Sequence, residues 1–424
     1  MNRRDFLHSS TALAALSLAG CNRKPVTTSA AATAPTLPYY DRVPALAPIR
    51  AHEDRIFRIT VCLRPFRATG PRIELEKVAD KSIIHNYGHG GSGWSLSWGS
   101  STIAVDKALA AFASTANAGA PSPEIAVIGC GALGITSATL LQRAGARVTI
   151  YAKERPPFVR SSRATGSWTP DSRVAFASAA PATFPAQWEQ MARTSWSMYQ
   201  SFLGMPGTPI EYIDTYGLSD LDATEALRRR EHLTPTPTGN PAQPELDFIR
   251  LQSRIPDLLP SPIDLPPGTH PFPTRHARRA TTLMFNVADY SRQLVTDFLI
   301  AGGKIETAEF HNPSEVSTIK QQVIINCTGY GARQLWSDNS ITPVRGQIAW
   351  LIPQPEVNYG LNFGSLNVLS RRDGIVVQPS PQGEATGWND DNEQPNRQEA
   401  EEGVRQLATL MNRMAPSPAP PRTS

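Results

Sequence analysis

The sequence predicts an α/β fold with a parallel sheet, on three observations. The apolar stretch at 125–128 is followed by the glycine run 129–134, a helical pattern at 132–144 and a second apolar stretch at 147–151. This order is typical of a βαβ unit, in which a helix connects two parallel strands. Further apolar strand-like runs lie on both sides of the unit, and 424 residues are enough for two or three domains.

The first residues resemble an export signal. Arg3 and Arg4 precede a short apolar run at 11–19, and Cys21 follows a stretch of small residues. The pattern is typical of a twin-arginine signal that ends in a lipoprotein cleavage site, with Cys21 as the lipidated residue. The run is too short to span a bilayer, which needs about 20 residues. We expect a protein at the periplasmic face, held to the membrane only by lipid at Cys21; a disordered basic tail on a cytoplasmic protein is the alternative.

Composition excludes several classes of function. The net charge of +4 is small, and the basic residues are dispersed without interleaved aromatics, so we expect no nucleic-acid partner. Cys62, Cys130 and Cys327 lie in apolar runs without paired spacing, and the eight histidines form no ligand motif. We therefore predict no metal and interpret these cysteines as small buried hydrophobic residues. The sequence does not set the oligomeric state.

The other elements follow from periodicity. Alternating or continuous apolar residues indicate strands, and Ala- and Leu-rich stretches with a 3.6-residue period indicate helices. In order, we predict strands at 55–63 and 82–84, helices at 102–112, 187–202 and 288–301, strands at 322–326 and 346–352, and a helix at 398–414. The proline-rich part from 180 to 280 suggests no site. The predicted organisation is a signal (1–21), a linker (22–54), a segment at 55–112, the βαβ part (124–180), a larger part (181–414) and a disordered tail (415–424).

The glycine run has the spacing GxGxxG. Gly129 is expected to make the tight turn, Gly131 to let the backbone approach a pyrophosphate, and Gly134 to let helix and strand pack closely. The free N–H groups of the helix N-terminus would then face the phosphates. Glu154 is the candidate for the ribose hydroxyls, although it stands one residue later than the second strand would place it. The motif predicts a dinucleotide site.

Several further motifs resemble the FAD-dependent D-amino-acid oxidase family. Residues 63–74 contain LRPFR and GPRIE, and residues 84–99 contain IHNYGHGGSG followed by SWG. Together they look closely like the C-terminal signature of that family. Residues 162–170 (SRATGSWTP) resemble its flavin-facing loop, while 324–329 (IINCTG) and 345–347 (RGQ) are similar to strands that follow. Since the signature here precedes the glycine run, the resemblance implies a circularly permuted chain, which the closeness of domain termini permits.

The resemblance implies a Rossmann-like FAD-binding domain with a parallel sheet, plus a substrate domain built on a mainly antiparallel sheet. It implies FAD as the cofactor. The residues expected to bind it are Gly129, Gly131, Ala132, Leu133, Gly134, Glu154, Ala164, Thr165, Gly166, Thr328, Gly329, Gly90, Ser92, Gly93, Trp94 and Ser95.

The resemblance also implies a substrate and a reaction. Arg72 is expected to hold the carboxylate of a D-amino acid, because a guanidinium offers a planar pair of donors; a salt bridge with Glu74 or Glu76 is the alternative. Gly91 would offer its backbone carbonyl to the substrate amino group. A hydride would pass from the substrate Cα to the flavin N5, and water would hydrolyse the resulting imino acid to a 2-oxo acid and ammonia. O₂ would then reoxidise the flavin and give hydrogen peroxide.

Two departures from the family pattern concern substrate choice. Asn367 stands where the family has a substrate-site tyrosine, and Gln378-Pro379 replaces an expected glycine pair. Tyr359 is a candidate replacement without a predicted position. Two alternatives to a D-amino-acid oxidase therefore stay open. One is a flavin-dependent dehydrogenase of related amines or glycine-like substrates that uses a membrane acceptor, and the other is a family member that binds flavin or an amino acid without turnover.

Overall fold

The computed structural model describes residues 45–115, 122–221 and 246–414. These described residues all belong to one compact unit. The predicted export signal, most of the predicted linker and the predicted C-terminal tail lie outside the described residues.

One of the two sheets is mainly parallel. Its six strands lie in the order β2 (Leu75–Val78), β3 (Lys81–His85), β10 (Val323–Asn326), β4 (Glu124–Ile128), β5 (Arg147–Ala152) and β9 (Lys304–Thr307). All neighbours pair in parallel except β2 and β3. With α2 (Ala132–Arg143) between β4 and β5, the structure confirms the predicted βαβ unit.

The other sheet is mainly antiparallel. Its eight strands lie in the order β1 (Ile56–Arg67), β11 (Ile341–Leu351), β14 (Gly374–Pro379), β13 (Leu366–Arg371), β12 (Tyr359–Phe363), β6 (Ile210–Ser219), β8 (His276–Phe285) and β7 (Ile263–Leu265). Only β12 and β6 pair in parallel. Two kinds of sheet were predicted, and both are present; β6, β7 and β8 come from the proline-rich part that the sequence left unassigned.

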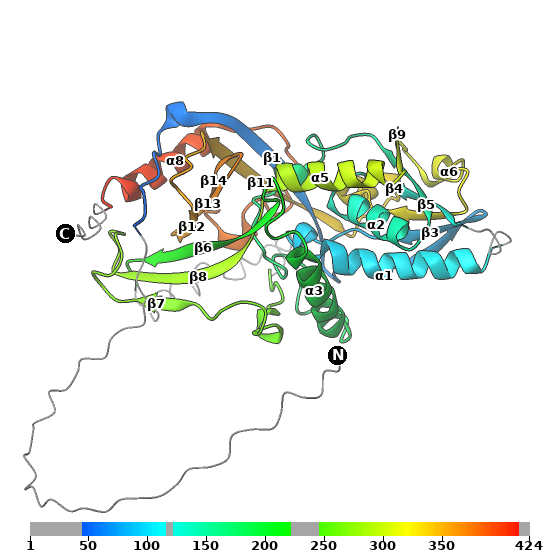
Figure 1. Ribbon diagram of the computed structural model, residues 1–424, viewed down its shortest axis with the longest axis horizontal. Helices are drawn as coiled ribbons and strands as arrows, with labels where there is room; N and C mark the ends of the chain where they lie inside the picture. Colours follow the sequence, from blue (N-terminus) through cyan, green and yellow to red (C-terminus); the bar gives the residue numbers. More distant parts are fainter. Residues whose placement is uncertain (1–44, 116–121, 222–245, 415–424) are drawn as a thin grey trace, which may run out of the picture. The chain divides into compact units, whose positions relative to one another are not determined.

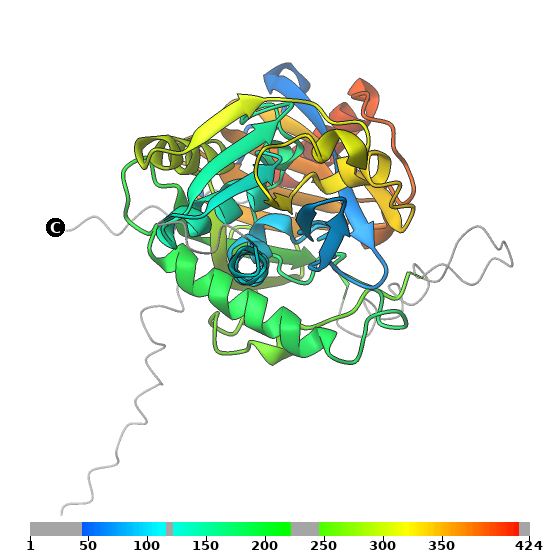
Figure 2. The same cartoon turned by 90° about the vertical axis from the view of Figure 1, so that its right-hand side faces the viewer.

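Helices pack around both sheets (Figure 1). They are α1 (Gly93–Ala113), α3 (Phe184–Gln200), α5 (Val287–Ile300), α6 (Pro313–Val316), α7 (Ala332–Leu335) and α8 (Arg397–Met411), with short 3-10 turns η2 (Glu53–Arg55), η3 (Arg160–Arg163), η4 (Gln252–Arg254), η5 (Gly329–Gly331) and η6 (Gly383–Ala385). Figure 2 shows α1 nearly end-on, with α3 running across it. Apart from its C-terminal half, α1 was not predicted, because its first eight residues after Gly93 are all buried and show no helical periodicity.

The two ends of the described chain pack together. Leu46 and Ile49 are buried in the same cluster as Val404 and Leu407 of α8, on one face of the antiparallel sheet. Figure 1 shows α8 in red beside the blue segment that leads into β1. The packed body therefore begins before residue 54, where the linker was expected to end.

The helices in the described ranges are all too short or too polar to cross a membrane.

Candidate active site

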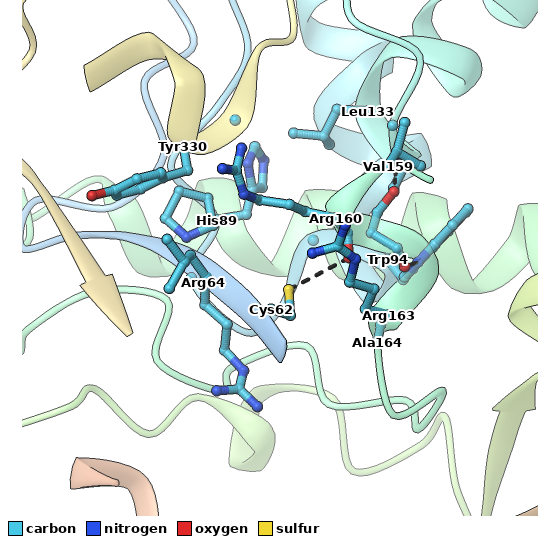
Figure 3. Close-up of a pocket in the computed structure, with 18 of the residues that line it drawn as sticks. Cys62, Arg64, His89, Trp94, Leu133, Val159, Arg160, Arg163, Ala164 and Tyr330 are labelled. Atoms are coloured by element: carbon cyan, nitrogen blue, oxygen red, sulfur yellow. Dashed lines mark hydrogen bonds between the residues drawn. The ribbon is translucent and has the colours of Figure 1, made fainter. Parts of the chain in front are cut away.

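A cavity of about 960 Å³ opens where the two sheets meet. Its wall includes Ile128 and Ala152, at the carboxyl ends of β4 and β5, and Cys327, which directly follows β10. The strands β1, β11, β13 and β14 contribute residues from the antiparallel sheet. Ligands of open α/β sheets bind at the carboxyl ends of the strands. Figure 3 shows part of this cavity from within.

The glycine turn after β4 is shaped by close backbone approaches. Gly129 has φ +100°, and a Cβ there would lie 2.6 Å from the carbonyl oxygen of Cys327. A Cβ on Gly134 would lie well under 3.0 Å from the carbonyl oxygen of Gly129. Gly134 therefore lets α2 pack against the turn and does not itself line the cavity, whereas Gly129 and Gly131 do.

The N-terminus of α2 faces the cavity. Gly131, Ala132 and Leu133 line it, and the backbone N–H of Ala132 donates to the Ser161 hydroxyl at 3.1 Å. Free N–H groups and the helix dipole favour an anion at this place. The sequence did not indicate Ser161, which belongs to η3 and is brought here by the fold; its backbone carbonyl also accepts from the Trp94 indole at 2.8 Å.

Glu154 lines the cavity beyond the end of β5. Its neighbour Lys153 pairs with Glu309 at 2.6 Å, while the Glu154 carboxylate has no hydrogen bond or ion pair within the described ranges. The carboxylate is therefore available to a ligand hydroxyl, although Glu154 lies one residue later in the sequence than the position expected for the acidic residue of the motif.

The loop from 160 to 166 forms another wall, and Ala164, Thr165 and Gly166 all line the cavity. Arg371 donates to the carbonyl oxygens of Ala164 and Thr165 at 2.8 and 3.2 Å. The Gly166 carbonyl accepts from the backbone N–H of Phe285 at 2.7 Å. In the first part of this loop, Arg160 and Arg163 both pair with Glu393, and both are labelled in Figure 3. The loop is thus held by two strands of the antiparallel sheet, β8 and β13, and by Glu393.

The glycine run before α1 lies along the cavity. Gly90, Gly91, Gly93, Trp94 and Ser95 line it. Thr328 and Gly329, which follow β10, line it as well.

Ser92 corrects the prediction for this run. It is fully buried, and its hydroxyl donates to the carbonyl oxygen of Ser172 at 3.0 Å instead of facing the cavity.

His89 presents an unused acceptor to the cavity. Its Nε2 lies 2.7 Å from the Ser100 hydroxyl, which itself donates to the Asn86 carboxamide oxygen at 2.6 Å. The hydroxyl oxygen must therefore accept a hydrogen bond from the Nε2–H group, which leaves Nδ1 of the neutral ring as a lone-pair acceptor. Nδ1 is buried without a partner among the described residues, and burial lowers the pKa of His89 to about 3. A neutral ring with a free acceptor fits a ligand that carries N–H or O–H groups.

Arg64 is the cation that β1 brings to the cavity. Its guanidinium lies over Gly346 of β11, where a Cβ would be well under 3.0 Å from both terminal nitrogens. One of these nitrogens donates to the carbonyl oxygen of Arg345 at 3.2 Å. Burial lowers the pKa of Arg64, and no carboxylate pairs with it in the described parts of the chain. A partly buried guanidinium without an ion-pair partner fits an anionic ligand group.

Arg72 does not lie in the cavity, which corrects the prediction that it holds the substrate. Its guanidinium pairs with Glu74 and Glu76, with a nitrogen–oxygen distance of 3.0 Å to Glu76. It also donates to the Tyr87 hydroxyl at 2.9 Å. Two of these partners are carboxylates that already compensate the charge of the guanidinium, so the salt-bridge alternative describes Arg72.

Asn367 and Gln378 are cross-strand neighbours on β13 and β14, and both line the cavity. The Asn367 carboxamide oxygen is buried without a partner in the described ranges, and Gln378 accepts from the Thr165 hydroxyl at 2.6 Å. Tyr359 lies elsewhere. It is buried with Leu46 and α8 on the other side of the sheet, and its hydroxyl donates to the Ala47 carbonyl at 2.8 Å.

The three described cysteines are free thiols that line the cavity. Burial raises the pKa of Cys130 to about 11 and that of Cys327 to about 12. Within the described ranges no three His, Cys, Asp or Glu side chains gather as a metal site would require.

Comparisons with known proteins agree with this geometry. The model of a family described as FAD-dependent oxidoreductases (DAO) matches residues 124–423. A D-amino acid oxidase of Dugesia ryukyuensis is 34% identical over 116 residues, which are 27% of this chain and 33% of the relative. The D-amino-acid oxidase of Rubrobacter xylanophilus is 28% identical over 224 residues (52% and 57%), and that of Dictyostelium discoideum is 23% identical over 304 residues (70% and 75%). The chain thus spans a third to somewhat over half the length of the first two.

Proposed function

Because the chain belongs to the DAO family of FAD-dependent oxidoreductases, we propose that it oxidises D-amino acids to 2-oxo acids and ammonia. The named activity of the relatives supports this substrate class. The observation that carries the proposal is the unpaired guanidinium of Arg64 in the same cavity as the glycine turn. One cavity therefore offers both a dinucleotide site and a carboxylate site.

The residues of the cavity fit FAD. Gly131, Ala132 and Leu133 at the N-terminus of α2 would hold the pyrophosphate, and Glu154 would accept from the ribose hydroxyls. Gly90 and Gly93 keep side chains out of the space beside α1, and the unpartnered Nδ1 of His89 would accept a hydrogen bond from the cofactor. When bound, FAD supplies the acceptor for the hydride that leaves the substrate Cα.

The chain itself has to orient the substrate. Arg64 would hold the carboxylate through two parallel charge-assisted hydrogen bonds, as proposed from the sequence for Arg72. The Gly91 carbonyl would accept from the amino group, and the unpartnered carboxamide oxygen of Asn367 is a further acceptor in the same cavity. Fixing the substrate in this way lowers the barrier by positioning, so no dedicated general base is required.

We propose O₂ as the electron acceptor, with transfer to a membrane acceptor as the second possibility. We also propose that the chain is permuted and exported. The family model begins at residue 124, after the segment with the oxidase-like signature, and the segment before β1 packs against α8. These two observations support the permutation, and the twin-arginine pattern supports export with lipid at Cys21.

The visible spectrum of the purified protein tests the function. An anaerobic mixture of D-amino acids should bleach the flavin absorption, whereas a protein that only binds flavin would keep its yellow colour. Admission of air should restore the colour within the mixing time if O₂ is the acceptor. Slow recovery in air with rapid recovery on adding a soluble quinone would indicate a dehydrogenase.

A further inference from the structure

A second arginine lines the cavity beside Arg64. Arg173 is 8% exposed, and its guanidinium reaches the cavity wall. Its Nε donates to the carbonyl oxygen of Glu384 at 2.7 Å, and its terminal nitrogens donate to the Gly383 carbonyl at 3.3 Å and the Ser172 hydroxyl at 3.1 Å. All three partners are neutral, and five N–H groups serve only three such bonds.

The two arginines flank the Gly90–Gly91 backbone. The Gly90 N–H donates to the carbonyl oxygen of Pro65, the residue after Arg64, at 2.9 Å. On the other side, the Gly91 N–H donates to the carbonyl oxygen of Ser172 at 3.0 Å. A Cβ on Gly90 would collide with the Arg173 carbonyl. The backbone segments that carry both arginines thus lie next to the backbone that is proposed to receive the substrate amino group, and both side chains line the same cavity.

No carboxylate in the described parts of the chain forms an ion pair with Arg64 or Arg173. Glu384, whose charge acts on Arg173 and which also lines the cavity, pairs with the exposed Arg250. Burial, then the charge of Arg64, lowers the pKa of Arg173 to about 9. Arg173 also has φ +49°, a conformation that is costly for a residue with a Cβ. A strained, buried cation without an ion-pair partner is expected where it meets an anion.

We propose that Arg173 binds a second carboxylate, so that the site takes D-amino acids with an acidic side chain. The α-carboxylate neutralises Arg64, and the side-chain carboxylate neutralises Arg173. This inference rests on the proposed function, and it adds a specificity-determining residue that the sequence did not indicate.

Two matched pairs of substrates test the proposal with the flavin-loaded protein. D-glutamate is compared with D-glutamine, and D-aspartate with D-asparagine, because each pair differs in charge and hardly in size. We expect kcat/KM to favour the acid by about ten- to hundredfold, as for a buried charge-assisted hydrogen bond. Arg173→Met should reduce this preference to threefold or less, and Arg173→Lys should restore part of it. Arg278→Gln, which removes the same charge from an exposed pair on β8, should leave the preference unchanged.

Ligand binding gives a readout without turnover. Succinate should perturb the flavin absorption at concentrations about tenfold lower than butyrate does, and Arg173→Met should remove the difference. Equal kcat/KM for acid and amide, with no effect of Arg173→Met, would overturn the proposal and leave the D-amino-acid oxidase function intact. If no D-amino acid bleaches the flavin, the proposed function fails, and the succinate titration still decides whether Arg173 binds a second carboxylate. If Arg173→Met does not fold, the same comparisons are made with Arg173→Lys.

Discussion

The guanidinium of Arg64 lies on the Cα of Gly346, across the β1–β11 pairing, and leaves no room for a Cβ at that position. The residues on either side of Gly346 in the sequence, Arg345 and Gln347, contact the start of α8. Arg345 pairs with Glu399 at 3.1 Å, and Gln347 bonds the backbone of Asn396, so both hold the start of α8. The RGQ sequence therefore anchors a helix on one face of the sheet and makes space for a cation on the other.

The first prediction concerns this space. Gly346→Ala should push the guanidinium away from its place and lower kcat/KM for D-amino acids by about ten- to hundredfold, because a charge-assisted pair is misaligned. Flavin content should stay the same. Gly217→Ala is the control, since a Cβ there would meet only one atom, at 3.8 Å. Equal loss of activity in both variants would mean that the effect is general destabilisation.

The second prediction concerns the cofactor. Gly131→Leu places a side chain into the cavity at the N-terminus of α2, where a Cβ would already lie 3.3 Å from the Ser161 hydroxyl. We expect a folded protein with less than about a tenth of the wild-type flavin, because the pyrophosphate can no longer approach the backbone. Absorption at 450 nm relative to 280 nm and far-UV circular dichroism measure the two properties. Full flavin content would refute the assignment of this turn.

The third prediction concerns pH. The pKa of His89 is lowered to about 3 by burial, so below its ordinary value of about 6.5 the unfolded chain binds a proton that the folded chain does not. Stability therefore falls as the pH drops from 6.5 towards 3, by about 1.4 kcal/mol per pH unit.

Denaturant titrations at pH 7 and pH 5 measure this effect. His89→Gln should reduce the loss of unfolding free energy between the two by about 2 kcal/mol. His276→Gln, at an exposed position, is the control and should leave the loss of unfolding free energy between pH 7 and pH 5 unchanged. An unchanged pH dependence in His89→Gln would contradict the burial of a neutral ring.

The fourth prediction concerns export. Replacing Arg3 and Arg4 together with lysine should keep most of the protein in the cytoplasm, because a twin-arginine signal is read through both side chains. Cys21→Ser should leave the protein exported but without lipid. Cell fractionation and labelling with a radioactive fatty acid are the measurements. If the wild type, the double lysine variant and Cys21→Ser show the same cellular distribution and the same lipid labelling, the first residues are not a signal.

Part of the fold could be predicted because it rests on local patterns. The strands β4 and β10 are continuous apolar runs, and the turn between β4 and α2 is defined by its glycines. The strands β6 and β8 could not be predicted in the same way. They pair with one another across more than 50 intervening residues, and their partly exposed faces give no clean alternation.

The choice between Arg64 and Arg72 shows why the site was only partly predictable. The two arginines lie within nine residues of the same motif, and the sequence alone does not show which of them faces the cavity. The answer depends on Gly346, which lies 282 positions further along the chain, and on the turn that brings Glu74 and Glu76 to Arg72. The nearby glutamates were a visible signal of the ion pairs. Arg173 gave no such signal, because its role depends on Gly90 and on a loop more than 200 residues away.

The most direct test compares two variants, Arg64→Met and Arg72→Met, in anaerobic reduction of the bound flavin by D-amino acids. Arg64→Met should lower the second-order rate of bleaching by at least about a hundredfold with flavin still bound, because losing one partner of a buried charge pair typically costs 2 to 5 kcal/mol, or about thirtyfold to several-thousandfold. Arg72→Met should bleach at a rate within about threefold of the wild type, and lose about 1 to 3 kcal/mol of stability through its unpaired glutamates. Rapid bleaching in Arg64→Met together with loss of bleaching in Arg72→Met would contradict the account and return the substrate carboxylate to Arg72.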